Sequence, residues 1–193
     1  MCGEHDALIE IENDTMTSEL KIRSERPDDI GAIAEVTYAA FQTLEISNHT
    51  EQFIIGALRS AKALTISLVA LAGGRVIAHI AFSPVTISDG SAGWYGLGPV
   101  SVLPEFQRQG VGSALIREGL SRLKALGAAG CCLVGHPGYY GRFGFENVPG
   151  LVFEGAPSEA FFALSFDGHV PTGSVEFHEA FKVEGGEAPV SDH

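Results

Sequence analysis

The stretch SVLPEFQRQGVGSALIREGL, residues 101–120, joins a strand-like run to a helix pattern through a turn that contains Gly110 and Gly112. Glycine costs roughly 1 kcal/mol relative to alanine inside a helix, so two glycines at a helix start need a reason. The first backbone N–H groups of a helix have no intrahelical acceptor, and the helix dipole makes that end positive. Without Cβ atoms, a phosphate can approach this main chain closely. The stretch therefore predicts an anion-binding turn, with close packing of the helix on a sheet as the alternative.

The charge around this turn favours an anionic ligand. Residues 104–124 hold four basic and two acidic residues, in a chain whose formal net charge is -12. The turn lacks the Gly-Lys-Ser/Thr of a P-loop, and the third glycine of a dinucleotide-binding fingerprint is missing. The phosphate ligand that we expect is therefore of another kind.

Length and composition predict one well-filled soluble domain. The chain has 193 residues, of which 45% are hydrophobic and 19% charged. The acidity lies in the ends, because residues 1–20 and 167–193 hold six acids each and only one base, Lys182. With no basic face in the composition, we expect no nucleic-acid partner.

Cysteine use and apolar runs exclude further classes. Cys2, Cys131 and Cys132 have no spacing typical of zinc ligands or a disulfide framework, and we expect no metal. The acidic N-terminus does not resemble a signal peptide, and no apolar run reaches the length of a membrane span. The sequence predicts a cytoplasmic protein without membrane contact.

Hydrophobic periodicity predicts two helices after a first strand at 19–25. The first helix starts near Pro27, and we expect Ile30, Ile33, Thr37 and Phe41 on its buried face. The second spans 49–61 with Asn48 as its cap. Its predicted apolar stripe consists of Phe53, Ile54, Ala57, Leu58 and Ala61.

The middle of the chain predicts a hairpin followed by a β-α-β unit. Gly73-Gly74 separates two β-branched runs within 64–87, and a third strand at 94–102 is interrupted at Gly98-Pro99. A helix at 110–126 then connects to a strand at 129–135, which requires parallel strands.

Weaker patterns follow the β-α-β unit. They are a short helix or turn near 138–143, a strand at 160–166 and a further candidate strand at 175–181. We expect an acidic arm at 1–18, one domain at 19–168 and an acidic extension at 169–193, whose last ten residues are disordered.

Two motifs stand out, QRQGVG at residues 107–112 and YYGRFGF at residues 139–145. The first fits the Q/R-x-x-G-x-G/A pattern of the GNAT superfamily of acyl-CoA-dependent N-acetyltransferases, and the second resembles the segment after that family's fifth strand. The likeness covers residues 19–166 and is closest to a bacterial subgroup of predicted acetyltransferases. It implies a single-domain α/β fold, with a mostly antiparallel mixed sheet, splayed parallel central strands and flanking helices.

The resemblance also implies an activity. Such enzymes move an acetyl group from acetyl-CoA to a primary amine by direct attack in a ternary complex. A non-catalytic acyl-CoA sensor and a transferase for another acyl-CoA stay as alternatives. We expect a small-molecule amine as the acceptor, and a homodimer is left open.

The resemblance assigns site residues as well. The segment Val100, Ser101 and Val102 would hold pantetheine. The pyrophosphate would lie on Arg108, Gln109, Gly110, Val111, Gly112 and Ser113. Tyr140 would protonate the departing thiolate, with Tyr139 as its competitor. His79, His136 or an ordered water would act as the base, and the loop with Glu45 and His49 would border the acceptor.

Overall fold

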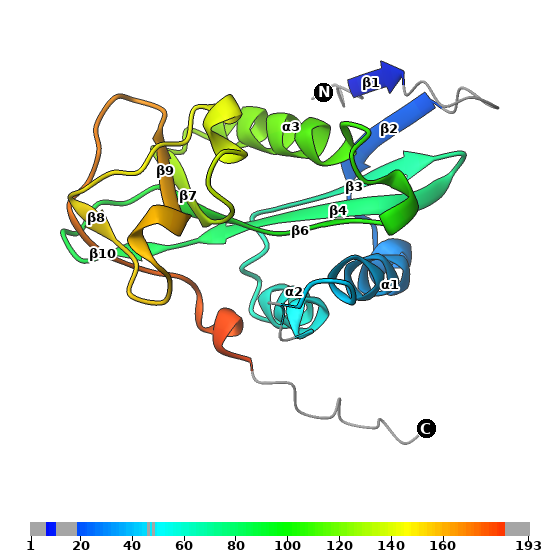
Figure 1. Cartoon of the computed structure of the whole chain (residues 1–193), viewed down its shortest axis with the longest axis horizontal. Coiled ribbons are helices and arrows are strands. Elements are labelled where there is room, and N and C mark those ends of the chain that lie inside the picture. Colours follow the sequence, from blue (N-terminus) through cyan, green and yellow to red (C-terminus); the bar gives the residue numbers. More distant parts are fainter. Residues whose placement is uncertain (1–6, 11–18, 46, 48, 184–193) are drawn as a thin grey trace.

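The fold is built on a seven-stranded twisted sheet in the order β1-β2-β3-β4-β6-β7-β9 (Figure 1). The computed structural model describes residues 7–10, 19–45, 47 and 49–183. The strands are β1 (Ala7–Glu10), β2 (Glu19–Ser24), β3 (Ile66–Ala72), β4 (Arg75–Pro84), β6 (Trp94–Val102), β7 (Gly130–Val134) and β9 (Phe161–Ser165). All neighbours pair antiparallel except β6 and β7, which are parallel. This is the mixed, mostly antiparallel sheet that the resemblance implied.

Helices cover both faces of the sheet (Figure 1). The helices α1 (Ile30–Phe41) and α2 (Glu51–Ser60) lie on one face, and α3 (Val111–Ala125) lies on the other. Short 3-10 turns complete the connections: η1 (Pro27–Asp29), η2 (Pro104–Phe106), η3 (Tyr140–Phe143), η4 (Ser158–Ala160) and η5 (Glu179–Lys182). Within the described part of the chain, no helix combines the length and apolarity that crossing a membrane requires.

A second, small sheet lies beside the end of the main one. It has the order β5-β10-β8, formed by β5 (Thr86–Ile87), β10 (Gly173–Glu176) and β8 (Leu151–Val152). The candidate strand at 175–181 is therefore half right, because β10 ends at Glu176 and η5 follows. Both lie in the predicted extension, whose last ten residues fall outside the described residues.

The central predictions from local signals are confirmed. The Gly73-Gly74 hairpin joins β3 and β4, and the helix predicted at 110–126 is α3, which buries Leu115, Ile116, Gly119, Leu120 and Leu123. Cys131 and Cys132 are fully buried in different clusters of the core, because successive strand residues face opposite sides. Burial raises the pKa of both thiols, so they act as small hydrophobic residues.

The predicted faces of the first two helices are wrong in part. Helix α1 buries Ile33, Val36, Thr37 and Ala40, whereas Ile30 is 41% exposed. Pro27 starts a 3-10 turn, so Ile30 only begins the α-helix and lies outside its packed stripe.

Helix α2 and the N-terminal arm also differ from the predictions. Helix α2 buries Ile54, Ile55 and Leu58 and leaves Phe53 exposed, because its face turns toward the sheet and η5. Thr50 occupies its N-cap position, and the predicted cap Asn48 lies outside the described residues. Strand β1 pairs with β2 in the arm where no element was expected.

Candidate active site

The two parallel strands at the centre of the sheet separate partway along their length. β6 and β7 pair at Trp94↔Gly130, Tyr95↔Cys131 and Gly96↔Cys132, and no further pair joins them within these described strands. Beyond this point β6 continues along β4, and β7 continues along β9 as far as Val134. We call the opening between residues 97–102 and 133–134 the fork. Gly96 and Cys132 form its apex.

A bulge in β6 accompanies the separation. Ile80 pairs with Val100 and Phe82 pairs with Leu97, so β6 has one residue more than β4 over this stretch. The extra residue falls at Gly98-Pro99, whose peptide bond is cis. The sequence predicted a break here, because proline cannot donate to a strand ladder.

The backbone of β6 presents alternate residues to the fork. The Leu103 N–H donates to the Ile77 carbonyl over 2.9 Å, so this residue faces β4. Alternation along the strand then directs the backbone groups of Val102 and Val100 to the opposite edge, toward the fork. The Val102 carbonyl is not used in the hydrogen bonds between β6 and β4. It accepts a hydrogen bond from Gln107 Nε2 at 3.0 Å instead.

Ser101 does not join Val100 and Val102 at the fork. It pairs with His79 on β4, and its buried hydroxyl donates to Thr37 Oγ1 of α1 at 3.3 Å. The structure therefore places Ser101 between β6 and α1. The resemblance implied three consecutive residues, but a strand can direct the backbone groups of only alternate residues to one edge.

The start of α3 has the backbone geometry of an anion site. Arg108 (φ 61°) and Gly110 (φ 84°) adopt left-handed conformations, and no side chain caps the helix at Gly110. The first helical bond runs from the Ala114 N–H to the Gly110 carbonyl. The N–H groups of residues 111–113 precede this bond and therefore have no intrahelical acceptor.

A cavity of about 420 Å³ connects this helix start with the open edge of β6. Its lining includes two arginines and both glycines of the turn, which suits a polyanionic ligand. The lining residues are Val102, Phe106, Gln107, Arg108, Gly110, Gly112, Ser113, Tyr139 and Arg142. Val102 of the strand and the predicted residues Arg108, Gly110, Gly112 and Ser113 of the turn thus meet at one cavity. The side-chain amide of Gln109 donates to the Glu105 carbonyl instead.

The two adjacent tyrosines lie at different places. The Tyr139 hydroxyl is 3.1 Å from Ser113 Oγ at the start of α3, and Arg142 stacks over its ring at 4.4 Å. The Tyr140 ring covers Gly135, directly after β7, and packs edge-on against Phe145. Tyr139 therefore belongs to the anion cavity, and Tyr140 lies along the β7 side of the fork.

The surroundings of Tyr140 keep its hydroxyl protonated. Burial, with a smaller contribution from the neighbouring Tyr139, raises the pKa of Tyr140 to about 12. A side chain that gives up a proton must hold it at neutral pH, and Tyr140 meets this requirement.

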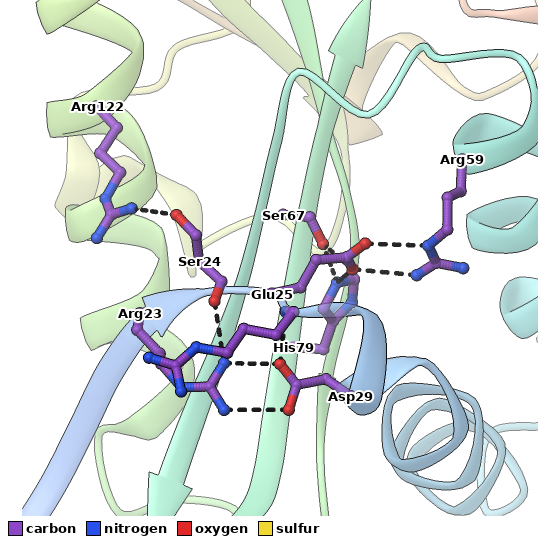
Figure 2. Close-up of polar contacts among 9 residues, drawn as sticks. Arg23, Ser24, Glu25, Asp29, Arg59, Ser67, His79 and Arg122 are labelled. Carbon is purple, nitrogen blue, oxygen red and sulfur yellow. Dashed lines mark hydrogen bonds and ion pairs between the residues drawn. The ribbon is translucent and has the colours of Figure 1, made fainter.

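His79 belongs to a buried polar network between the sheet and α2 (Figure 2). The Ser67 hydroxyl donates to the Glu25 carboxylate, so Nε2 of His79 carries its proton and donates to the Ser67 oxygen over 2.7 Å. Arg59 makes two hydrogen bonds of 3.0 Å to the same carboxylate. Burial lowers the pKa of His79 from 6.5 to about 4. These contacts favour a structural role for His79 over that of a base.

A second group of polar contacts lies beside this network, along β2 and η1 (Figure 2). Arg23 pairs with Asp29 in η1 at 2.6 and 3.1 Å, and the pair lowers the pKa of that carboxyl. Arg122 of α3 donates to Ser24 Oγ at 2.7 Å. Sequence analysis did not detect either group, because most of these contacts join residues far apart in the chain and form no motif.

The other base and acceptor candidates are exposed. The His136 ring places Nδ1 2.6 Å from the Pro137 carbonyl, which leaves Nε2 as the acceptor nitrogen. Glu45 and His49 lie in the connection between α1 and α2. In the part of the chain that the structure describes, no His, Cys, Asp and Glu side chains gather as a metal site.

Comparisons with known proteins agree with this architecture. A family model described as an acetyltransferase (GNAT) domain matches residues 21–148. The chain is 34% identical over 167 residues to a protein of Escherichia coli strain K12 described as the uncharacterized N-acetyltransferase YhbS. That alignment covers 83% of this chain and 97% of YhbS.

Solved structures resemble the chain over most of its length. The crystal structure of a GNAT family acetyltransferase from Brucella melitensis in complex with acetyl-CoA is 51% identical, with a TM-score of 0.75. The alignment covers 84% of this chain and 97% of the Brucella melitensis chain. The structure of Escherichia coli YhbS in complex with CoA is 31% identical, with a TM-score of 0.79 and coverage of 90% and 98%. The chain belongs to the GNAT acetyltransferase family.

Proposed function

We propose that this protein transfers an acetyl group from acetyl-CoA to a primary amine. The observation that carries the proposal is the fork between β6 and β7, which adjoins the uncapped start of α3 through one cavity. An opening for an extended chain beside a site for phosphate suits a ligand with a long arm and a pyrophosphate. The similar proteins from Brucella melitensis and Escherichia coli were solved with acetyl-CoA and CoA, which supports this assignment.

The residues of this chain can hold such a ligand through main-chain groups. Val100 and Val102 direct their backbone toward the fork, where pantetheine amides could pair as a strand would. The N–H groups from Arg108 to Ser113 would hold the pyrophosphate at the positive end of α3. Arg108 and Arg142 line the same cavity and add positive charge.

Acetyl transfer requires two proton transfers, because the attacking amine loses a proton and the departing sulfur gains one. The amine nitrogen attacks the thioester carbonyl, the C–N bond forms and the C–S bond breaks. The Tyr140 hydroxyl donates its proton to the departing sulfur. The surplus proton of the amine passes to a base, for which the exposed His136 or a water molecule is the candidate. Burial raises the pKa of Cys131 and Cys132, so neither supports an acyl-enzyme route.

We infer that the acceptor is a small cationic amine. Acidic residues such as Glu45 would attract its ammonium group before it loses a proton, since only the neutral amine attacks. The rate should rise with pH through the neutral range as base and acceptor lose protons. The cytoplasmic location and a homodimer stay predictions.

Two measurements test the proposed function. Calorimetric titration with acetyl-CoA measures binding, and release of free thiol measures turnover with a panel of amines, amino acids and peptides. Binding with thiol release supports the transferase. Tight binding without release from any amine would favour the non-catalytic sensor. Thiol release only with a longer or charged acyl-CoA would favour a transferase that uses that acyl-CoA in place of acetyl-CoA.

A further inference from the structure

We propose that the C-terminal strap, residues 173–183, forms a wall of the acceptor site, and that the Phe177 ring sets the size of amine that reaches the fork. The inference rests on the proposed function and assigns it a specificity-determining residue. The strap comprises β10, the link through Phe177 and His178, and η5. It lies beyond the part of the chain that the family model matches.

The Phe177 ring lies directly on the apex of the fork. A Cβ atom added to Gly96 would be 2.6 Å from Cε1 and 2.8 Å from Cδ1 of Phe177. Gly96 and Cys132 form the last pair before β6 and β7 separate. The absence of a side chain at Gly96 therefore lets the ring lie against the backbone where the opening begins.

Strand geometry shows which face of the sheet the ring covers. Phe82 of β4 packs against Gly119 of α3, and its partner Leu97 on β6 lies on the same face. Gly96 precedes Leu97, so its vacant side-chain position points to the opposite face. That is the face of α1 and α2, where Ser101 bonds Thr37.

The acceptor must approach from the face that Phe177 covers. Helix α3 and the anion cavity at its start lie on the other face, so a CoA ester bound there occupies that approach. An amine can then reach a thioester at the fork only from the side of α1 and α2. The Phe177 ring lies at the point where this path meets the apex.

Both ends of the strap are fixed, which holds the ring in place. In β10, Val175 is buried and pairs with β5, while in η5 Ala180 is buried against Ile54 and Leu58 of α2. Figure 1 shows this segment, drawn in red, leading from β10 to the side of α2. The strap therefore joins the small sheet to α2 across the α1 and α2 face.

Phe177 is itself only half-buried, unlike its anchors. Its ring meets Phe153 edge-on at a centroid distance of 4.9 Å and Phe181 at 5.4 Å. The two rings and the backbone of Gly96 together hold the Phe177 ring in one position, and the part of the ring that stays exposed is available to a ligand. We expect it to admit small amines and to obstruct bulky ones.

The test uses the full-length protein and compares a bulky with a small primary amine, benzylamine with ethylamine. In Phe177→Ala the ratio of kcat/KM for benzylamine to kcat/KM for ethylamine should rise about 10-fold or more. A change of this size is usual when an apolar pocket gains room for a larger substrate. Phe177→Leu, which keeps most of the packing volume, should raise the ratio less. The dissociation constant of acetyl-CoA should change less than about two-fold in both variants, because the ring lies away from the phosphate cavity.

Phe166→Ala is the matched control, because it removes a partly buried ring that packs beside Lys124 of α3, away from Phe177 and Gly96. This variant should leave the ratio unchanged. An unchanged ratio in both Phe177 variants, or an equal change in Phe166→Ala, overturns the role of Phe177 while wild-type turnover keeps the proposed function. No thiol release by the wild type with any amine, despite acetyl-CoA binding, overturns the transferase and the acceptor wall together.

Discussion

The hydroxyl groups of Tyr139 and Ser113 lie 3.1 Å apart, which fixes Tyr139 at the start of α3. The next residue, Tyr140, covers Gly135 at the end of β7. Two consecutive tyrosines thus reach different places, one at the cavity beside the start of α3 and one along the fork. The sequence left the choice of proton donor between them open, and this arrangement supports Tyr140.

Substitution of Tyr140 should therefore affect kcat, whereas substitution of Tyr139 should affect the dissociation constant of acetyl-CoA. Tyr140→Phe should lower kcat about 10- to 1000-fold, because the departing thiolate loses its proton donor, and acetyl-CoA affinity should barely change. Tyr139→Phe should weaken acetyl-CoA binding with little loss of kcat, because its hydroxyl lies at the phosphate cavity. Steady-state kinetics and calorimetry measure both. Loss of kcat in Tyr139→Phe alone would reverse the assignment.

A negative charge in the first turn of α3 should separate folding from ligand binding. A side chain at Gly112 would meet Val102 only at ordinary contact distance, so Gly112→Ala should fold and bind. Gly112→Asp should keep or raise the melting temperature, since an acid is favourable at a helix start. It should weaken acetyl-CoA binding about 10-fold or more by repelling the pyrophosphate. Unchanged affinity in a folded Gly112→Asp would refute the phosphate site.

Stability should fall in acid because of His79. Burial holds the pKa of His79 at about 4 in the folded protein, against 6.5 when unfolded. Below pH 6.5 the unfolded chain therefore takes up a proton that the folded protein does not. The free energy of unfolding should decrease as pH falls from about 6.5 toward 4, by roughly 3 kcal/mol in total.

Urea denaturation of the wild type and His79→Gln between pH 7 and 4.5 measures this contribution. The variant should lose most of the pH dependence, because glutamine does not titrate but can still bond Ser67. Burial alone would raise the pKa of Glu25, but hydrogen bonds from Arg59 and Ser67 lower it below 4.5, so its effect falls at more acid pH. The same change at the exposed His169 is the control. Equal pH slopes in wild type and His79→Gln would contradict the prediction.

Two glycine-to-alanine substitutions should change the stability of the fold in opposite directions. A Cβ at Gly119 of α3 would overlap the ring of Phe82, which is fully buried, so Gly119→Ala should destabilise the fold by about 1–3 kcal/mol. Nothing lies within 4 Å of the equivalent position at Gly56 of α2. Gly56→Ala should stabilise by up to about 1 kcal/mol through helix propensity. Thermal denaturation checks both, and stabilisation by Gly119→Ala would disprove the close packing of α3 on β4.

Local signals were sufficient wherever one short segment determines its own conformation. The Gly73-Gly74 turn predicted the β3–β4 hairpin, Gly98-Pro99 marked the bulge in β6, and the periodicity of residues 110–126 predicted α3. Together with the motif at 107–112 they predicted the parallel pair and the phosphate turn. Backbone dihedral preferences and the alternation of apolar residues act over a few residues, so the sequence alone could determine these features.

Contacts between distant residues were decided only by the tertiary structure. The Phe177 ring on Gly96, the network of His79 with Glu25, and the separation of Tyr139 from Tyr140 depend on how whole elements pack. The rotation of α1 that exposes Ile30 has the same origin. A sequence pattern shows which side chains can share a face, but the face that is buried depends on the partner that packs against it. The sequence itself therefore determined where the glycine turn before α3 and the fork lie, and the packing of the C-terminal strap and of α1 and α2 decided what surrounds them.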